Sequence, residues 1–324
     1  MITAEALRPY LSTRLWEAEI PELPGRYRGK VRENYDLTDG RRLLIATDRL
    51  SAFDRELTAV PLKGRLLTSL SRFWFEATAD VCPNHVLGWP DPNVVLCRRL
   101  DMLPIELVVR DYLTGTTSTS LWTMYAAGRR EMYGHRFPGG LREHQKLDAT
   151  LITPTTKADA RGHDAPLSGE EVVQRGLLSP SDWAQVCALA LALFERGRSL
   201  AAERGVILVD TKYEFGWDPQ GRIVLADEIH TPDSSRFWRA GSYAERIAAG
   251  LAPERLDKDQ IRAWVAARCD PYREPVPPIP DEVVLETGAA YLAAFETLAG
   301  RPFDLPDPDE APLDRIRRNL AGFF

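Results

Sequence analysis

Two strand-forming segments joined by a short turn constrain the fold of this chain more than any other feature. Residues 206–217 and 222–228 are largely apolar and flank the four-residue turn Asp-Pro-Gln-Gly. A turn of this composition favours antiparallel pairing of the segments on either side. If the pairing starts directly at the turn, Trp217 lies opposite Arg222. Residues 206–228 are therefore predicted to form a β-hairpin in that register.

The predicted hairpin gathers charged side chains on one face. Side chains alternate along a strand, so Asp210, Lys212 and Glu214 share a face, and Asp227 lies opposite Lys212 and diagonal to Glu214. A slip of one residue would present Glu228 in place of Asp227. Mg²⁺ takes one or two carboxylates together with nucleotide phosphates, and a nearby lysine balances the remaining phosphate charge. The pattern is typical of a Mg-nucleotide site. The alternative is a strand with exposed cross-strand ion pairs, which the apolar run before Asp210 disfavours.

Lysine is rare in this chain. Of its 41 basic residues, six are lysine and 35 are arginine. Three of the six, Lys30, Lys157 and Lys212, lie in segments that resemble ligand-binding ones. Arginine presents a planar fork of donors, whereas lysine reaches a phosphate oxygen as a compact point charge. We therefore expect the lysines retained in these segments to contact phosphate.

A basic segment at residues 28–32 contains Gly29 and Lys30. It is not a Walker loop, because it lacks the spaced glycines and the Lys-Ser/Thr pair that opens a helix. Two interpretations remain open. One is a strand-turn-strand flap whose backbone and lysine lie over phosphates, and the other is an ordinary basic hairpin.

Residues 47–54 place a threonine, an arginine, a serine and two aspartates directly after a predicted buried strand. Loops at strand ends are common ligand sites. The alternative is an Asp/Ser turn closed by a packed Phe53.

Length and composition exclude several classes of protein. The chain has 324 residues, 44% of them hydrophobic, and no apolar run approaching the roughly 18 residues that span a membrane. Its first 20 residues carry charges and no signal-peptide core, so we expect a cytoplasmic protein. Four widely spaced cysteines argue against a zinc site and a disulfide scaffold. A net charge of −6 disfavours nucleic-acid binding.

Strands and helices are mixed along the chain. Strands are predicted at residues 94–100 and 107–110, and a helix at residues 66–78. The strongest helix signal is at residues 179–204, where a serine cap and a proline precede an apolar stripe. A proline-rich run at residues 271–280 precedes a closing helix. Residues 129–145 carry no catalytic pattern.

Short motifs occur in this chain in the order found in SAICAR synthetases, the phosphoribosylaminoimidazole-succinocarboxamide synthases of purine biosynthesis. They lie at residues 29–33, 48–54, 104–110 with Gly115, 157–159, 162–164, 210–216 and 233–236. None is specific alone, but the ordered set is. The chain resembles this family over about residues 20–303.

The resemblance implies both a fold and an activity. The implied fold is α/β of the α+β type, two-lobed and loosely kinase-like. Residues 1–108 would form a β-rich N-terminal lobe with the phosphate flap, and residues 109–324 a mixed α/β lobe with the substrate and metal sites and a C-terminal helix. The implied activity is an ATP-dependent carbon-nitrogen ligase. It joins L-aspartate to the carboxylate of carboxyaminoimidazole ribonucleotide (CAIR) through an acyl phosphate, giving SAICAR, ADP and phosphate, with ATP and Mg²⁺ as cofactors.

Site residues carry over by motif position. The residues implied to bind the nucleotide cofactor are Gly29, Lys30, Arg32, Glu106, Lys212, Glu214 and Asp227. The residues implied to bind CAIR are Asp48, Ser51, Arg110, Thr116, Asp164, Asp210 and Arg236. Lys212 and Asp210 are the implied catalytic residues, and Glu214 with Asp227 would hold Mg²⁺. Thr116 stands where the family usually has serine, and the hydroxyl is kept.

Two other functions would use the same cleft but not the same chemistry. A small-molecule kinase would stop after phosphorylation, but its catalytic strings His-Arg-Asp and Asp-Phe-Gly do not occur in the sequence. A nucleotide-binding regulatory protein without turnover would lack metal ligands, yet Glu214 and Asp227 are both present. The expected partners are therefore small-molecule substrates.

Overall fold

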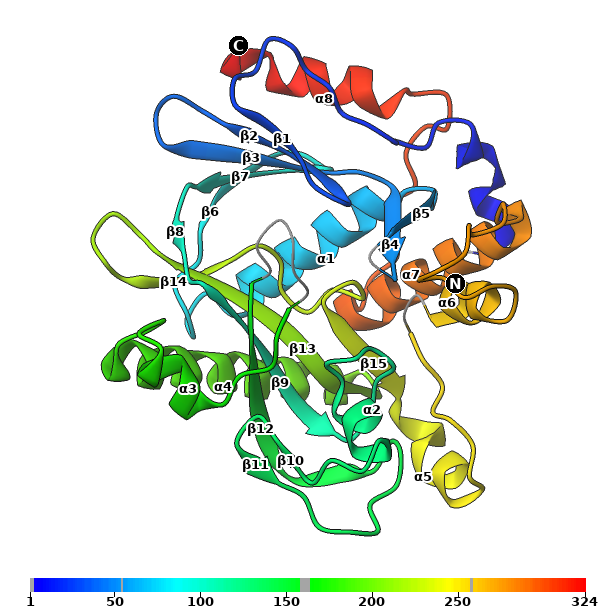
Figure 1. Ribbon diagram of the computed structural model, residues 1–324. Coiled ribbons are helices and arrows are strands. Elements are labelled where there is room, and N and C mark those ends of the chain that lie inside the picture. The colour runs from blue at the N-terminus through cyan, green and yellow to red at the C-terminus, as the bar shows by residue number, and fades with distance from the viewer. Residues whose placement is uncertain (1–2, 54, 158–163, 257–258) are drawn as a thin grey trace.

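The computed structural model describes residues 3–53, 55–157, 164–256 and 259–324. Two antiparallel sheets stand one above the other, and helix α1 (Lys63–Ala77) lies between them (Figure 1). Among the described residues, no helix combines the length and the apolar character needed to cross a membrane.

The first sheet has the strand order β1-β2-β3-β7-β6. Leu43 and Ile45 pack against Ile316 of helix α8 (Pro312–Leu320), which covers the outer face of the sheet (Figure 1). Leu44 lies between them in sequence and points to the opposite face, because side chains alternate along a strand. The strands are β1 (Arg26–Arg28), β2 (Arg32–Asp36), β3 (Arg41–Ala46), β6 (Val86–Asp91) and β7 (Val94–Arg98).

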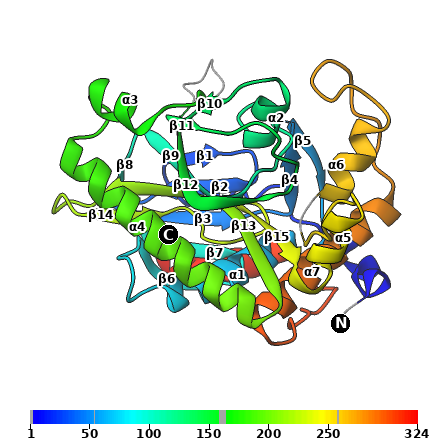
Figure 2. The same ribbon diagram turned by 90° about the horizontal axis from the view of Figure 1, so that it is seen from below.

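The second sheet has the order β12-β9-β13-β14, and the short strands β8 and β15 also pair with β13. Helix α4 (Pro180–Glu203) crosses one face of this sheet (Figure 2). Its buried Val186, Ala190 and Phe194 belong to the same core cluster as Leu208 of β13. The strands are β8 (Asp101–Met102), β9 (Ile105–Tyr112), β12 (Lys146–Thr156), β13 (Val206–Trp217), β14 (Ile223–Ala226) and β15 (Ser235–Arg239).

Shorter elements surround these two sheets. The small hairpins are β4 (Arg49–Ala52) with β5 (Arg55–Ala59), and β10 (Glu131–Met132) with β11 (His135–Arg136). The remaining helices are η1 (Ala4–Leu11), α2 (Leu121–Ala126), α3 (Gly169–Gln174), α5 (Ala240–Ala248), α6 (Asp259–Ala266), α7 (Asp281–Ala299) and η2 (Ala321–Phe323). The N-terminal helix η1 packs against α7.

The strongest helix prediction is confirmed. Helix α4 starts at Pro180, and the hydroxyl of Ser179 accepts a hydrogen bond from the backbone N–H of Asp182 at 3.1 Å. This bond satisfies one of the N–H groups that a helix start leaves unpaired. The division of the chain at residues 108 and 109 stays a prediction. That boundary falls inside β9, a central strand of the second sheet.

The predicted hairpin forms, but its register is wrong by one residue. Trp217 pairs with Ile223 and not with Arg222. The backbone N–H of Asp218 donates to the carbonyl oxygen of Arg222 at 3.0 Å, and Gly221 has a left-handed φ of 74°. A left-handed glycine at this point adds a residue to the turn, as in hairpins closed by a glycine bulge.

The corrected register also changes the neighbours of the charged residues. Glu214 pairs with Ala226, and Lys212 lies opposite Val108 of β9 and not opposite Asp227. Regular alternation would turn Asp227 away from Glu214. However, β14 ends at Ala226, and Asp227 has a left-handed φ of 61° that breaks the alternation. The direction of Asp227 is therefore set by the chain leaving the strand.

Candidate active site

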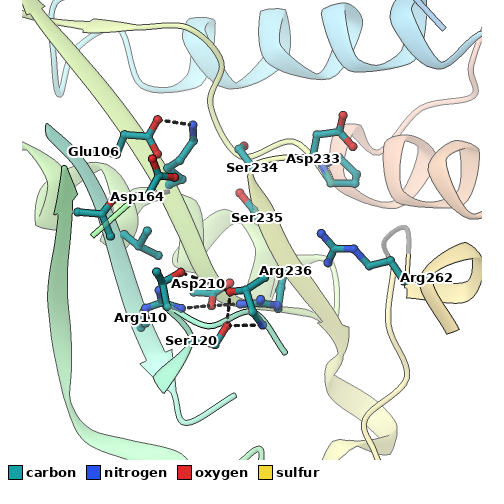
Figure 3. Close-up of a pocket in the computed structure, with 16 residues that line it drawn as sticks. Glu106, Arg110, Ser120, Asp164, Asp210, Asp233, Ser234, Ser235, Arg236 and Arg262 are labelled. Atoms are coloured by element: carbon teal, nitrogen blue, oxygen red, sulfur yellow. Dashed lines mark hydrogen bonds and ion pairs between the residues drawn. The ribbon is translucent and has the colours of Figure 1, made fainter. Parts of the chain in front are cut away.

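Two cavities, each of about 200 Å³, meet at strand β13. We call the first the central cavity; its lining includes Glu106, Arg110, Ser120, Asp210, Lys212 and Arg236 (Figure 3). We call the second the inter-sheet cavity, because it lies between the first sheet and the β13–β14 hairpin; its lining includes Arg42, Leu44, Met102, Lys157, Glu214 and Asp227.

Lys212 lies at the junction of the two cavities. Its Nζ donates to Glu106 Oε1 at 3.1 Å and to Glu214 Oε1 at 2.7 Å. Glu106 lines the central cavity and Glu214 lines the inter-sheet cavity. Lys157 Nζ donates to the other oxygen of Glu214 at 2.6 Å. One ammonium group therefore connects the walls of both cavities.

Lys212 and Glu214 both carry their charges at neutral pH. Burial by itself would raise the pKa of Glu214, but Lys212 and Lys157 outweigh burial and hold that pKa at about 2. Burial also acts against the charge of Lys212, yet Glu214 and Glu106 raise the pKa of Lys212 overall. Burial raises the pKa of Glu106, with Lys212 acting in the opposite direction. Glu214 is thus available as a charged oxygen ligand.

Asp210 brings two arginines together in the central cavity. It pairs with Arg110 on β9 and with Arg236 on β15, so the strand register places both guanidinium groups beside its carboxylate. Arg110 Nη1 donates to Asp210 Oδ2 at 3.1 Å, and Arg236 Nη1 donates to the same oxygen (Figure 3). Burial lowers the pKa of Arg110. Two cations sharing one carboxylate leave a positive charge for an anionic ligand.

Asp227 and Glu228 share a single arginine. Arg32 Nη1 donates to Asp227 Oδ1, and Arg32 Nη2 donates to Glu228 Oε2 at 2.5 Å. Only Asp227 of the two lines the inter-sheet cavity, where Glu214 also lies. The strand register alone would turn Asp227 away from Glu214. Because Asp227 has a left-handed φ, both side chains nevertheless line the inter-sheet cavity.

Glu214 and Asp227 fit a Mg²⁺ ion that is bound mainly through a nucleotide. Within the part of the chain that the structure describes, no group of three or more His, Cys, Asp or Glu residues converges as a metal cage would. Two hard carboxylate donors in one cavity match the usual Mg²⁺ site, in which phosphates and waters supply the other ligands.

Three residues expected to bind CAIR line neither the central cavity nor the inter-sheet cavity. Asp48 is buried outside both cavities, and its oxygens accept from the backbone N–H groups of Leu15 at 2.8 Å and Gly64 at 2.9 Å, so it holds the fold. Ser51 lies on β4 and lines neither cavity. Thr116 is exposed and lines neither cavity. Their role in binding CAIR stays a prediction.

The loop after β9 leaves Thr116 exposed and outside the lining of the central cavity. Gly115 has a left-handed φ of 107°, and a Cβ there would lie 2.4 Å from Ser120 Oγ. The loop folds back on itself at this glycine and presents Thr117 and Ser120 to the central cavity in place of Thr116. A motif position alone does not reveal such a fold.

The remaining predicted residues have defined places. Asp164 lies exposed at the edge of the central cavity. The backbone N–H of Gly29 donates to the carbonyl oxygen of Arg32 at 2.8 Å, which closes the turn between β1 and β2, and Lys30 is exposed in that turn. The flap interpretation stays a prediction, because neither residue lines a cavity here. Of the motif residues, Asp54, Asp159, Gly162 and His163 lie outside the described residues.

Sequence reasoning missed several lining residues, among them Ser120, Asp233 and Arg262. Asp233 accepts a hydrogen bond from Tyr291 at 2.5 Å and forms an ion pair with the buried Lys63 at 2.7 Å. Lys63 is one of the six lysines, so lysine scarcity was the available signal. No comparable signal marked Ser120 or Arg262.

Comparison with known proteins identifies the family. The sequence model of the SAICAR synthetase family matches residues 25–279. The chain belongs to the SAICAR synthetase family. A relative from Legionella pneumophila (strain Paris), named phosphoribosylaminoimidazole-succinocarboxamide synthase, is 48% identical over 96% of this chain and 98% of its own length.

Solved structures of SAICAR synthetases have the same α/β fold, which confirms the predicted fold class. The SAICAR synthase from Saccharomyces cerevisiae complexed with SAICAR has a TM-score of 0.77 and 31% identity, over 90% of this chain and 100% of that one. A type-2 SAICAR synthetase in complex with ADP has a TM-score of 0.66 and 26% identity, over 87% of this chain and 100% of that one.

Proposed function

We propose that this protein is an ATP-dependent ligase that joins L-aspartate to the carboxylate of CAIR, giving SAICAR, ADP and phosphate. The observation that carries the proposal is the position of Lys212, bonded at once to Glu106 in the central cavity and to Glu214 in the inter-sheet cavity. A phosphoryl group passing from a nucleotide in one cavity to a carboxylate in the other would cross this ammonium group.

The inter-sheet cavity suits a nucleotide. Leu44, Leu100 and Met102 supply an apolar surface for a base, while Lys157 supplies positive charge for phosphates. The ADP complex of a family member supports ATP as the phosphoryl donor. Mg²⁺ held by Glu214 and Asp227 would neutralise part of the phosphate charge. The flap of Gly29 and Lys30 would close over this cavity from the first sheet.

The central cavity suits CAIR. This ribonucleotide is an anion, and Arg110 and Arg236 present two guanidinium groups that share the carboxylate of Asp210. Asp210 and Asp164 would accept hydrogen bonds from the amino group or the ribose hydroxyls. The complex of the yeast relative with SAICAR supports a ribonucleotide site in this fold.

The chemistry follows from the weakness of a carboxylate as an electrophile. A CAIR carboxylate oxygen attacks the γ-phosphorus of ATP, which releases ADP and forms an acyl phosphate. The amine of aspartate then attacks the acyl carbon, and inorganic phosphate leaves with the former carboxylate oxygen. Lys212 stabilises the negative charge of the transferring group, because a fixed cation in a partly buried site acts strongly. The cytoplasmic location expected from the sequence stays a prediction.

Measuring ADP release with each substrate omitted in turn tests the proposal. Turnover should require ATP, Mg²⁺, CAIR and aspartate together. Sustained ADP release with CAIR but without aspartate would indicate a kinase that stops at phosphorylation. Release that depends on neither CAIR nor aspartate would contradict the ligase assignment altogether.

A further inference from the structure

Residues 129–145 lie beside the loop at residues 113–120, which forms one wall of the central cavity. Strands β10 and β11 pair Met132 with His135, so Tyr133 and Gly134 form a two-residue turn. Tyr133 has φ 57° and Gly134 has φ 78°. Glycine adopts this conformation freely, whereas a tyrosine in it is strained. Such strain persists only where other contacts fix the residue.

The contact that fixes Tyr133 is made with the cavity loop. The Tyr133 side chain is buried in a small core cluster with Leu121 and Met124. Its hydroxyl donates to the carbonyl oxygen of Thr119 at 2.6 Å. Thr119 lines the central cavity. The tyrosine hydroxyl therefore holds the loop, and it also interacts with Arg110, which lines the same cavity.

A second strained residue holds the start of the same loop. His144 is buried and has φ 65°. Its ring Nδ1 is 2.9 Å from Thr114 Oγ1, and its backbone N–H donates to the carbonyl oxygen of Leu113 at 2.8 Å. The hydroxyl of Tyr243 donates to the His144 carbonyl oxygen at 2.8 Å, which anchors the histidine to helix α5.

Inside the cavity, the loop is ordered around Ser120. The Ser120 hydroxyl accepts from the backbone N–H of Thr117 at 3.1 Å and lies 2.8 Å from Thr117 Oγ1. Both side chains face the cavity that also holds Arg110. The loop thus presents the side chains of Thr117 and Ser120 to the cavity. It is also bonded to residues 129–145 through the side chains of Tyr133 and His144.

We propose that residues 129–145 act as a clamp on the loop at residues 113–120, with Tyr133 and His144 as positioning residues for the ligand of the central cavity. The clamp keeps Thr117 and Ser120 at the distance from Arg110 that an anionic ribonucleotide requires. The identity of that ligand rests on the proposed function; the clamp does not.

Tyr133→Phe is the direct test, because it removes one hydroxyl and keeps the ring in the core. Loss of one hydrogen bond is expected to raise the KM for CAIR about 3- to 10-fold, with kcat and the KM for ATP changed less than about 2-fold. Amide hydrogen exchange at residues 117–120 should become about 3- to 10-fold faster. On a Ser120→Ala background the same change should have a smaller effect on the KM for CAIR, since both act through one loop.

Tyr125→Phe is the matched control. Tyr125 is buried in the same cluster. Its hydroxyl donates to the carbonyl oxygen of Pro138 at 2.8 Å and accepts from the backbone N–H of Leu141 at 3.0 Å, so it contacts residues 129–145 but makes no hydrogen bond to the loop at residues 113–120. This variant should lose at least as much thermal stability, with all KM values and loop exchange unchanged. If Tyr133→Phe behaves like Tyr125→Phe in every measurement, the clamp is wrong. Faster loop exchange with a raised KM for ATP alone would support the clamp and overturn the assignment of the central cavity to CAIR.

Discussion

Lys212 donates one hydrogen bond to Glu106 and another to Glu214, so a single ammonium group belongs to the walls of two neighbouring cavities. Both bonds depend on a compact charge reaching two carboxylates from one side. In the proposed function, this relationship would connect the nucleotide in the inter-sheet cavity with the substrate in the central cavity.

Lys212→Arg should lose most of its activity although the charge is kept. The planar fork of arginine cannot occupy a site built around a point charge, and a misplacement of about 1 Å costs roughly 100-fold in rate. Steady-state kcat and kcat/KM measure the effect. Lys146→Arg, at an exposed position of β12, is the control and should be unaffected. Near-normal kinetics in Lys212→Arg would remove the catalytic role assigned to this lysine.

Asp227→Asn and Glu228→Gln test whether Asp227, and not the adjacent Glu228, binds Mg²⁺ as proposed. Arg32 binds both carboxylates, so each variant loses one partner of the same arginine. Only Asp227 lines the inter-sheet cavity. Asp227→Asn should raise the Mg²⁺ concentration for half-maximal activity about 10-fold or more, and Glu228→Gln should be milder. A Mg²⁺ titration of ADP release decides, and the reverse ranking would refute the metal assignment.

Ser120→Ala and Thr116→Ala test which residue of the loop at residues 113–120 contacts the ligand of the central cavity. Ser120 is buried and its hydroxyl orders the cavity wall, whereas Thr116 is exposed. Ser120→Ala is expected to raise the KM for CAIR about 3- to 10-fold through loss of one hydrogen bond. Thr116→Ala should leave it unchanged. A larger effect at Thr116 would restore the residue implied by family position.

Stability should fall as the pH is lowered from 7 to 5. Burial is the main cause that lowers the pKa of His85 and His230 to about 3 and that of His144 to about 4. The unfolded histidines have ordinary values near 6.5, so below that pH the unfolded state binds more protons and is favoured, by about 2 kcal/mol for each histidine at pH 5. Burial raises the pKa of Asp48 to about 6, so this carboxyl binds its proton more readily in the folded state.

Asp48 offsets about 1 kcal/mol of this loss at pH 5. Together, the three histidines and Asp48 are expected to lower the free energy of unfolding by about 5 kcal/mol. Urea unfolding at pH 7 and pH 5 measures the difference. A free energy of unfolding that is constant, or higher at pH 5, would show that these histidines are not buried in the neutral form.

The sequence by itself determined the features that depend on local rules. Alternation along a strand predicted that Lys212 and Glu214 share a face, and their 2.7 Å hydrogen bond confirms it. Capping chemistry predicted the start of α4 at Pro180. The motif order predicted the family and the fold class. The first two rest on interactions between residues a few positions apart, and the third rests on short motifs whose order can be followed along the sequence.

Only the tertiary structure decided which distant residues meet. Asp210 meets Arg110 and Arg236 because β13 lies between β9 and β15, a neighbourhood that no local pattern specifies. Gly221 shifted the hairpin by one residue, and the left-handed backbone of Asp227 then returned its carboxylate to the cavity of Glu214. These two effects oppose each other, and their outcome depends on backbone angles set by the packing of the whole molecule, so sequence alone could not resolve it.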